Sequence, residues 1–426
     1  MRLYLGFATP VGWHGLPWMW RQPVASPPVG DTMNAGAGRF PDGFSWGTAT
    51  AAHQIEGGNW NNDWWAWEHA PDSPCAEPSG DACDSWNRWS EDVALVADLG
   101  LHTYRFSLEW SRIEPEPDEW SHAAVAHYRA MCEALLARGI DPTVTFHHFT
   151  TPRWVAERGG WENPDTAARF ARFCGRAAAE LRDVLRRACT INEPNIVALI
   201  GWLVGVFPPG KRDAGLRHHV NDVFIRGHRE AAAAIRASAP GVPVGLTLAM
   251  SDYQAIEGGE KRRDHVRQGI EDVFLDAVSG DDFLGVQTYS RQRIGPEGPL
   301  GPEPGVAVLP MGYEYWPAAL EATLRRAWDY TGGQVPLLVT ENGIGTDDDE
   351  QRIDYVREAL AGVERCLADG IDVRGYSYWS LLDNFEWAYG YGPRFGLVSV
   401  DRQTFARTPK PSAEWFGQVA RMNQVV

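Results

Sequence analysis

The sequence predicts an α/β protein that folds as a single (β/α)8 TIM barrel. Three observations support this prediction. Eight short strand-like runs alternate with longer alanine-rich amphipathic segments, no run of linker composition separates them, and the chain has 426 residues. Alternating strands and helices are typical of parallel β-α units, and eight such units close a barrel. A barrel with long loops can use a chain of this length as one domain.

The expected strands and helices follow one another in a regular order. The strands are predicted at residues 44–49, 103–107, 141–146, 187–192, 242–248, 283–289, 336–341 and 373–380. The helices are predicted at residues 86–99, 123–138, 164–185, 220–238, 268–277, 316–330 and 351–369. Residues 296–309 are dense in glycine and proline, which predicts an elaborated barrel loop.

The barrel domain is predicted to span residues 39–426. Residues 1–38 are expected to be an N-terminal extension, either disordered or the product of an over-extended start, because Met33 directly precedes the recognisable domain. The extension lacks the apolar centre of a secretory signal. No segment reaches the roughly 18 continuous apolar residues of a membrane span.

Charge and composition restrict the classes of function. A net charge of −17 argues against nucleic acids and anionic membrane surfaces as partners, because both call for basic patches. Twenty tryptophans suggest flat surfaces on which sugar rings stack, or else a large aromatic core. The six cysteines show no metal-ligand spacing, and only Cys75 and Cys83 lie where they could pair. We therefore expect a reduced, cytoplasmic protein without a metal.

Two similar stretches each place one glutamate at the end of an expected strand. Glu193 lies in residues 190–194 (Thr-Ile-Asn-Glu-Pro), where proline cannot extend a sheet. Glu341 lies in residues 339–343 (Val-Thr-Glu-Asn-Gly), which end a buried apolar run. Either glutamate alone is more simply interpreted as a loop residue. Together, each beside an asparagine, they predict an active site with two carboxylates.

Other polar and aromatic residues also follow the expected strands. They are Gln54, Glu56, Arg105, His147, His148, Asn192, Tyr289, Trp379, Glu386 and Trp387. Active sites of barrel enzymes lie at the carboxyl ends of the strands, so these residues are expected to share one mouth. A metal site at the two histidines is disfavoured, because adjacent strand residues point to opposite faces. His147 is expected to be structural.

Several motifs carry a family resemblance. They are residues 40–57 (Phe-Pro-Asp-Gly-Phe-Ser-Trp-Gly-Thr-Ala-Thr-Ala-Ala-His-Gln-Ile-Glu-Gly), the two glutamate stretches, residues 378–388 (Tyr-Trp-Ser-Leu-Leu-Asp-Asn-Phe-Glu-Trp-Ala), residues 394–397 (Arg-Phe-Gly-Leu) and residues 407–413 (Arg-Thr-Pro-Lys-Pro-Ser-Ala). In this order they resemble glycoside hydrolase family 1, the β-glucosidase family of retaining glycosidases.

The resemblance implies a retaining exo-acting β-glycosidase, foremost a β-glucosidase with β-galactosidase or β-fucosidase side activity. Glu341 would be the nucleophile and Glu193 the general acid/base, about 5–5.5 Å apart. Arg105 would support the charged form of Glu341, as would a hydrogen bond from Tyr289. The implied substrates are small β-glucosides or oligosaccharides such as cellobiose, and no metal or organic cofactor is implied.

The resemblance also implies which residues hold the sugar. These substrate-binding residues are Gln54, His148, Asn192, Tyr289, Trp379, Glu386, Trp387 and Phe395. Asn192 would donate to the 2-hydroxyl, Gln54 and Glu386 would bind the outer hydroxyls, and Trp379 would form the stacking floor. Because Glu386 and Trp387 stand where phosphate-binding relatives carry serine and lysine, a phosphorylated substrate is not expected.

The sequence departs from the family pattern at two places. Residues 147–152 (His-His-Phe-Thr-Thr-Pro) replace the usual Tyr-His-Trp-Asp-x-Pro, and residues 287–289 (Gln-Thr-Tyr) replace Asn-Tyr-Tyr. The second departure leaves the role of the asparagine to Gln287. The aglycone side is therefore the least constrained part of the site. Its candidates are Trp161, Trp202, Phe207 and Trp316.

Three other functions compete with this interpretation. A silent sugar-binding barrel is expected to lack at least one of the two glutamates, and a thioglucosidase is expected to carry glutamine in place of Glu193. Both glutamates are present, which favours the hydrolase. An inverting hydrolase stays open, since it differs in the separation of the two carboxyl groups.

Overall fold

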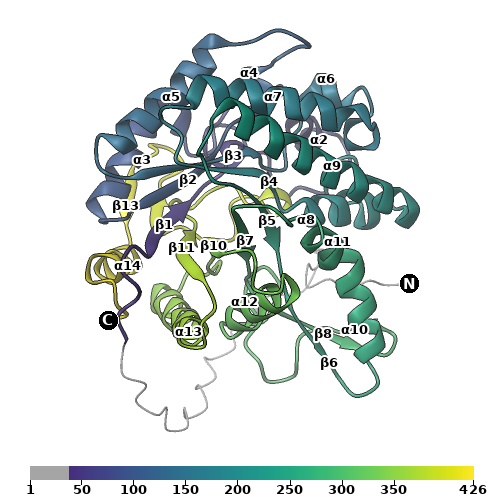
Figure 1. Ribbon diagram of the computed structural model, residues 1–426, viewed down its shortest axis with the longest axis vertical. Helices are drawn as coiled ribbons and strands as arrows, with labels where there is room; N and C mark the ends of the chain where they lie inside the picture. The colour runs from purple at the N-terminus through teal and green to yellow at the C-terminus, as the bar shows by residue number, and fades with distance from the viewer. Residues whose placement is uncertain (1–37) are drawn as a thin grey trace.

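The computed structural model describes residues 38–426 and confirms the barrel (Figure 1). Its eight strands close in the order β1-β11-β10-β7-β5-β4-β3-β2, and neighbouring strands run parallel. The bounds are β1 (Ser45–Ala49), β2 (Thr103–Ser107), β3 (Asp141–His147), β4 (Arg187–Asn192), β5 (Val244–Ala249), β7 (Phe283–Gln287), β10 (Leu337–Asn342) and β11 (Val373–Trp379). The prediction for residues 1–38 concerns residues that lie, Gly38 excepted, outside the described part of the chain.

The predicted strands differ from the observed ones only at their ends. Strand β5 begins at Val244 instead of residue 242, since Pro243 has no N–H to donate to the ladder. Strand β7 ends at Gln287 instead of Tyr289, where the pairing with β10 shifts register between Val339 and Glu341. Such shifts bend a strand and redirect its side chains.

Helices surround the barrel as expected. The long ones are α3 (Ser85–Asp98), α5 (His122–Leu136), α7 (Asp165–Leu181), α9 (Ala214–Ser238), α12 (Ala319–Tyr330), α13 (Asp349–Ala368) and α14 (Pro411–Met422). The helix predicted at residues 268–277 is wrong in form. Those residues form a π-helical turn (Gln268–Asp272) and the short helix α11 (Val273–Leu275), and a helix that was not predicted, α10 (Glu260–Arg267), precedes them. Helix α10 is largely polar and buries no residue, so it lacks the apolar pattern from which a helix is predicted.

The loops after the strands carry short elements of their own. The helices are α1 (Ala52–Ile55), α2 (Asp63–Glu68), α4 (Trp110–Ile113), α6 (Arg153–Ala156) and α8 (Pro194–Leu199), and a π-helical turn (Ile200–Val204) continues α8. A small sheet of β6 (Asp252–Ala255), β8 (Arg291–Gly295) and β9 (Gly298–Pro299) lies beside α10 and α12 (Figure 1). Strands β12 (Val398–Val400) and β13 (Arg407–Pro409) form a separate pair.

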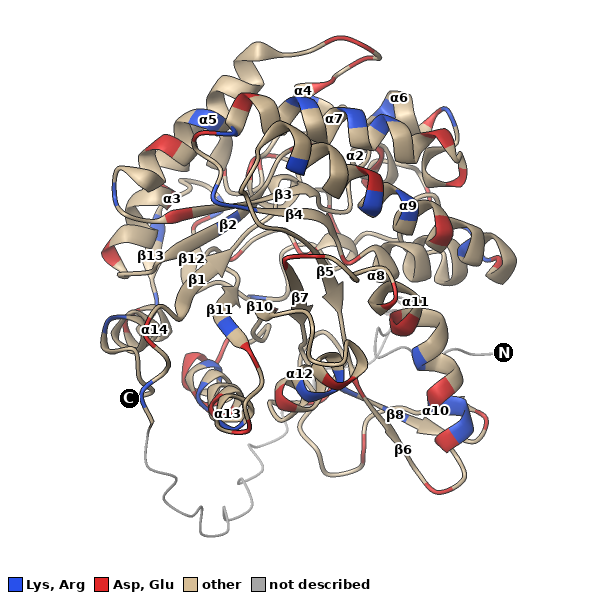
Figure 2. Ribbon diagram, in the orientation of Figure 1, with Lys and Arg blue, Asp and Glu red and all other residues tan. Residues whose placement is uncertain are grey.

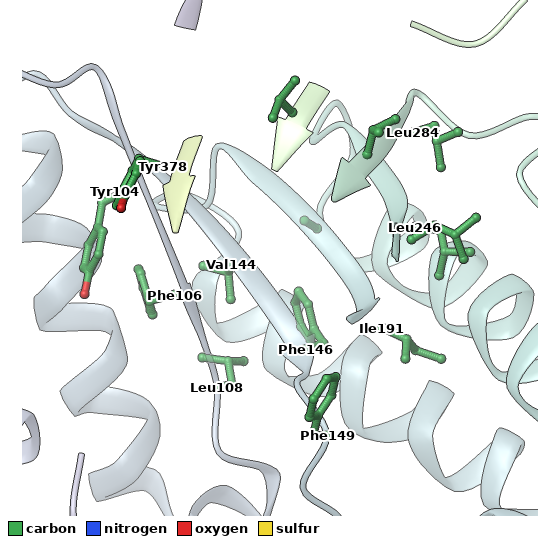
Figure 3. Packing of buried hydrophobic residues seen from close by; sticks show 14 of the residues in the cluster. Tyr104, Phe106, Leu108, Val144, Phe146, Phe149, Ile191, Leu246, Leu284 and Tyr378 are labelled. Atoms are coloured by element: carbon green, nitrogen blue, oxygen red, sulfur yellow. The ribbon is translucent and has the colours of Figure 1, made fainter. Parts of the chain in front are cut away.

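The two faces of the barrel strands differ in polarity. Apolar side chains such as Phe106, Phe146 and Leu246 belong to one large buried cluster with residues of the surrounding helices (Figure 3). Several residues of the alternate parity carry hydroxyls or a charge, and the hydroxyls of Thr103 and Thr143 lie 3.0 Å apart in a hydrogen bond. This alternation follows from the two-residue period of a strand. It leaves a polar interior in which a charged side chain finds partners.

Charged residues gather on the helices around the barrel (Figure 2). Helices α5, α7 and α13 carry many of them, while the barrel strands carry few (Figure 2). A helix that is both long and apolar enough to span a bilayer is absent from residues 38–426.

The close packing of the barrel predicts the effect of one added methyl group. A Cβ on Gly245 would lie 2.1 Å from the carbonyl oxygen of Phe283 on the neighbouring strand. Because two backbones cannot absorb this overlap without separating, Gly245→Ala should destabilise the protein by roughly 1–3 kcal/mol. Urea unfolding followed by tryptophan fluorescence measures this change. Gly301→Ala is the matched control, since nothing lies within 4 Å of its Cβ. An unchanged midpoint for Gly245→Ala would contradict the tight β5–β7 contact.

Candidate active site

A cavity of about 360 Å³ opens at the carboxyl ends of the barrel strands. Ten of the predicted site residues line it: Gln54, His148, Asn192, Glu193, Tyr289, Glu341, Trp379, Glu386, Trp387 and Phe395. These residues come from segments far apart in the sequence, which the closed barrel brings together. Arg105, the remaining predicted residue, lies below the cavity and hydrogen-bonds to two of its lining residues.

Glu193 is aimed at the cavity by its backbone conformation. It lies between β4 and α8 with φ 44° and ψ 54°, in the left-handed region. This conformation costs a non-glycine residue of order 1 kcal/mol. Its N–H donates to the carbonyl of Thr247 at 2.9 Å, and Pro194 starts α8 directly after it. The turn is thus held from both sides. Phe149 and Trp387, which also line the cavity, have positive φ as well.

Glu341 is held by a cation and a phenol. Arg105 Nη1 donates to Glu341 Oε1 at 2.6 Å, and the Tyr289 hydroxyl donates to Glu341 Oε2 at 2.7 Å. The Arg105 and Glu341 side chains are only 1% and 5% exposed, so the ion pair is almost free of water. Charge-assisted bonds of this kind are short and orient both partners. Each carboxylate oxygen of Glu341 therefore has its own donor.

The same guanidinium orients the neighbour of Glu193. Arg105 Nη2 and the Thr247 hydroxyl both donate to Asn192 Oδ1. Because an amide oxygen only accepts, these two bonds fix the Asn192 side chain with its NH₂ group on the other side. That group lies 3.2 Å from His148 Nε2. The Arg105 cation thus connects β10, which contains Glu341, with β4, whose last residue Asn192 directly precedes Glu193.

The two central carboxyls differ in proton affinity. Burial raises the pKa of Glu193 well above its ordinary value, and the negative charge of Glu341 raises it further. Burial also raises the pKa of Glu341, but the Arg105 charge and the hydrogen bonds from Tyr289 and Arg105 oppose that rise. Because Glu341 is bonded to a cation and a phenol whereas Glu193 receives only the neutral Gln287 amide, a single proton shared by the pair resides on Glu193.

His148 offers a donor to the cavity. Its Nε2 accepts from the Asn192 amide, so the proton of the neutral ring sits on Nδ1. Burial, the Arg105 charge and His147 all lower the pKa of His148 well below its ordinary value, which keeps the ring neutral. Nδ1 is buried and has no partner among residues 38–426. A ligand hydroxyl is the natural acceptor for it.

Gln54 and Glu386 form a second polar corner. The Gln54 amide nitrogen donates to the Phe385 carbonyl at 2.7 Å and to Glu386 Oε2 at 3.3 Å. Its oxygen, Oε1, is buried without a partner. Burial, supported by the charge of Glu341, raises the pKa of Glu386 to about 8. Since orphaned buried polar atoms are rare, this corner is built for a ligand with several hydroxyls.

Aromatic rings form the walls next to these polar groups. The rings of His148 and Trp379 stack with centroids 5.7 Å apart, and those of His148 and Trp387 with centroids 6.1 Å apart. Trp387 is in turn stacked on His53 at 5.7 Å. Phe395 meets Tyr289 edge-on at 5.9 Å. Flat apolar faces beside hydroxyl-binding groups suit a pyranose ring.

The structure corrects part of the aglycone prediction. Only Phe207 of the four predicted aromatic residues lines the cavity. Trp161 stacks on Phe224, the Trp202 indole donates to Glu162, and Trp316 lies under the guanidinium of Arg291. The tryptophan surplus is thus mostly core packing, and Trp379 and Trp387 are the lining tryptophans of the described chain. The position of a tryptophan in the sequence does not show whether its indole faces the cavity.

Sequence reasoning missed one contribution to the site and left the contact made by another open. Tyr313 lines the cavity, and its buried hydroxyl has no partner in the protein. Its segment, 312–316 (Gly-Tyr-Glu-Tyr-Trp), carries no signal beyond its aromatic content. Gln287 was assigned only by position. Its amide nitrogen donates to Glu193 Oε1 at 2.9 Å, which makes it the direct partner of that carboxyl.

Metal ligands and disulfides do not contribute to this region. Among residues 38–426, no cluster of three or more His, Cys, Asp or Glu side chains is arranged to hold a metal ion. Cys75 and Cys83 are both free thiols, so the pairing that their positions allowed is not formed. His147 is buried beside Thr151 and Trp161, as a structural histidine would be.

A family model matches nearly the whole described chain. The model for glycosyl hydrolase family 1 aligns with residues 37–279 and 302–425. The unmatched stretch between them contains Gln287, Tyr289 and the strands β8 and β9. One of the two departures from the family pattern, at residues 287–289, lies in this stretch.

Named relatives and a solved structure agree with that match. The chain is 35% identical to thermostable β-glucosidase B of Thermobispora bispora, with 91% of this chain and 92% of the relative covered. It is 34% identical to the bifunctional β-D-glucosidase/β-D-fucosidase of Bifidobacterium breve, covering 88% and 97%. The crystal structure of β-glycosidase BGL167 superposes with a TM-score of 0.85 at 47% identity, covering 91% of this chain and 98% of that one.

The raised pKa of Glu386 predicts a pH-dependent cost to stability. Folding moves this pKa from its ordinary value of 4.5 to about 8, so between these values the folded state holds a proton that the unfolded state has lost. The stabilising effect of that proton is complete below about pH 4.5 and fades as the pH rises. Glu386→Gln should therefore be more stable than the wild type at pH 7.5, by up to about 4 kcal/mol.

Urea unfolding at pH 4.5 and pH 7.5 tests this prediction. The advantage of Glu386→Gln should shrink toward zero at the lower pH. The exposed substitution Glu119→Gln is the matched control and should show no comparable change between the two pH values. An advantage that is equal at both pH values would assign the gain to packing instead of ionisation.

Proposed function

This chain belongs to glycosyl hydrolase family 1 and is a retaining β-glycosidase of the β-glucosidase class, and we propose that Glu341 is its nucleophile and Glu193 its general acid/base. The single observation that carries the proposal is the unequal treatment of two carboxyls in one cavity. Glu341 receives a cation and a phenol. The pKa of Glu193 is raised by burial and by the negative charge of Glu341. A retaining glycosidase needs one ionised and one protonated carboxyl.

In the first step the ionised oxygen of Glu341 attacks the anomeric carbon of the substrate. The bond from that carbon to the leaving oxygen breaks, and Glu193 gives its proton to this oxygen. The products are a glycosyl ester on Glu341 and a free alcohol. Ester formation removes the negative charge of Glu341, which contributes to the high pKa of Glu193. The pKa of Glu193 therefore falls once the intermediate has formed.

In the second step Glu193 acts as a base. Its carboxylate takes a proton from water while the water oxygen attacks the anomeric carbon, and the ester bond to Glu341 breaks. Two displacements at one carbon restore the original β configuration. The Arg105 guanidinium is already in place to receive the returning charge on Glu341. Because this donor needs no rearrangement, it stabilises charge at the moment it forms.

The remaining cavity residues are proposed to hold a terminal β-glucosyl unit. His148 Nδ1 and Gln54 Oε1 supply one unpaired donor and one unpaired acceptor. Asn192 supplies an oriented amide for the 2-hydroxyl, and Trp379 supplies the flat face. A protonated Glu386 can both donate to and accept from sugar hydroxyls. This set favours small β-glucosides or oligosaccharides, with β-fucosides and β-galactosides as further substrates.

We also propose that the enzyme acts in the cytoplasm. All six cysteines are free thiols, and five of them are buried. A reducing compartment maintains cysteines in this state.

Removal of the nucleophile tests the assignment of Glu341. Glu341→Ala should hydrolyse p-nitrophenyl β-glucoside roughly 10⁴-fold more slowly than the wild type, the scale of loss expected for a reacting group. Azide fits the vacated space and should restore turnover, giving the α-glucosyl azide. With Glu193→Ala, azide instead attacks the glycosyl-enzyme and should give the β-glucosyl azide. NMR of the products distinguishes the two anomers. If Glu341→Ala keeps full activity, the wrong glutamate has been assigned.

A second variant tests the role of Tyr289 in holding the charge of Glu341. Tyr289→Phe deletes the hydroxyl that donates to Glu341 at 2.7 Å. The ionised form loses a stabilising bond, so the pKa of Glu341 rises. The acidic limb of the kcat/KM profile should move upward by roughly 1–2 pH units.

The matched control is Tyr330→Phe, which deletes a surface hydroxyl that donates to Asp276 at 2.9 Å. This substitution removes the same chemical contact outside the cavity and should leave the profile in place. An acidic limb that does not move in Tyr289→Phe would show that a group other than Glu341 determines it.

A further inference from the structure

The cavity has two chemically different halves. The half around Gln54, His148 and Glu386 contains the unpaired polar atoms described above. The other half is lined by aliphatic side chains from α8 and from the turn and loop that follow it. They are Ile196, Leu199, Ile200, Val204 and Val206. Phe207 continues this wall toward Phe149, with ring centroids 5.5 Å apart.

The position of Glu193 shows which part of a substrate meets this wall. The assignment of this wall to a part of the substrate rests on the proposed function, in which Glu193 protonates the leaving oxygen. Helix α8 starts directly after Glu193, so Ile196 and Leu199 follow it within two turns of helix. A group attached to the leaving oxygen must therefore pass along α8. The aliphatic wall belongs to the aglycone and not to the glucosyl unit.

The opposite side of this half of the cavity has polar side chains, but most of them already form hydrogen bonds or ion pairs within the protein. Arg291 is paired with Glu303 at 2.5 Å and with Glu314, and its third nitrogen donates to Gln254 at 2.9 Å. The Gln292 amide donates to the Leu300 carbonyl at 3.1 Å.

One further polar group at this edge is also occupied. The Ser290 hydroxyl donates to the carbonyl of Glu314 at 2.6 Å. The Arg293 guanidinium is only loosely paired, 3.9 Å from Glu303, and is the free cation at this edge of the described chain. Met250 and Leu300 supply apolar surface between these groups. The edge thus offers few free partners to incoming hydroxyls.

We propose that this half of the cavity selects an apolar aglycone, an alkyl or aryl alcohol, over a second sugar. A second sugar would bring hydroxyls against the side chains of Ile196, Ile200 and Val204, where they lose water and gain no partner. An alkyl chain loses nothing there and gains burial. Leu300 and the polar residues of β8 lie in the stretch that the family model leaves unmatched.

A substrate series with the wild-type enzyme tests the proposal directly. The series is methyl, butyl and hexyl β-glucoside, with cellobiose and p-nitrophenyl β-glucoside alongside. Full burial of a methylene corresponds to about fourfold in kcat/KM, and contact with one wall to about twofold. Hexyl β-glucoside should therefore exceed methyl β-glucoside by roughly 30-fold, and it should exceed cellobiose as well.

Two substitutions test the wall itself. Ile196 and Val204 are partly exposed in the cavity. Ile196→Thr combined with Val204→Thr keeps the branch at each Cβ and adds two hydroxyls, while Ile196→Thr also removes the terminal methyl group, as the control below does. The hexyl-to-methyl ratio of kcat/KM should fall by about fivefold, and the cellobiose-to-hexyl ratio should rise. Ile256→Thr is the matched control, because Ile256 is 39% exposed and does not line the cavity. It should leave both ratios unchanged.

The outcomes separate the two levels of inference. Cleavage of p-nitrophenyl β-glucoside together with a preference for cellobiose over hexyl β-glucoside would overturn the apolar aglycone and leave the proposed function intact. A hexyl-to-methyl ratio near one would overturn it in the same way. Failure to cleave every β-glucoside would overturn the proposed function, and the inference with it. Since the wild-type series needs no variant, poor folding of the double substitution leaves the test valid.

Discussion

The buried charge of Arg105 is the constraint on which the site depends. A guanidinium that is 1% exposed costs several kcal/mol unless oxygen atoms surround it. The barrel supplies them from strands β3, β4, β5 and β10: the Thr145 hydroxyl at 3.0 Å, the Asn192 amide, the Thr247 hydroxyl at 3.4 Å and the Glu341 carboxylate at 2.6 Å. The threonine-rich inner face of the strands is the setting that makes this burial possible.

This constraint creates the difference between the two carboxyls. The cation is bonded to Glu341, so Glu193 meets burial and like charge with Gln287 as its direct partner. The same cation fixes the Asn192 amide, and this amide in turn sets the tautomer of His148. Proton location, amide orientation and histidine tautomer thus follow from one ion pair. Changing Arg105 would disturb all three together.

The cavity combines groups that the protein leaves unpaired with groups that it pairs completely. Gln54 Oε1, His148 Nδ1 and the Tyr313 hydroxyl are buried without partners, at a cost to folding that a bound ligand recovers. On the aglycone side the polar groups of Ser290, Arg291 and Gln292 are instead used within the protein. The proposed specificity, for a sugar on one side and an apolar group on the other, rests on this division.

The sequence by itself determined the eight strands, the two glutamates and the residues around them, because those signals are local. Alternation, strand-ending proline or glycine and contiguous motifs sit within a few residues of Glu193, Glu341 and Trp387. Only the tertiary structure decided which side chains share the cavity where no motif applies. Tyr313 lines it while Trp161 and Trp202 pack in the core, and Ile200 and Val204 face the aglycone. Which way such a side chain faces depends on contacts with distant segments, and no local pattern encodes those contacts.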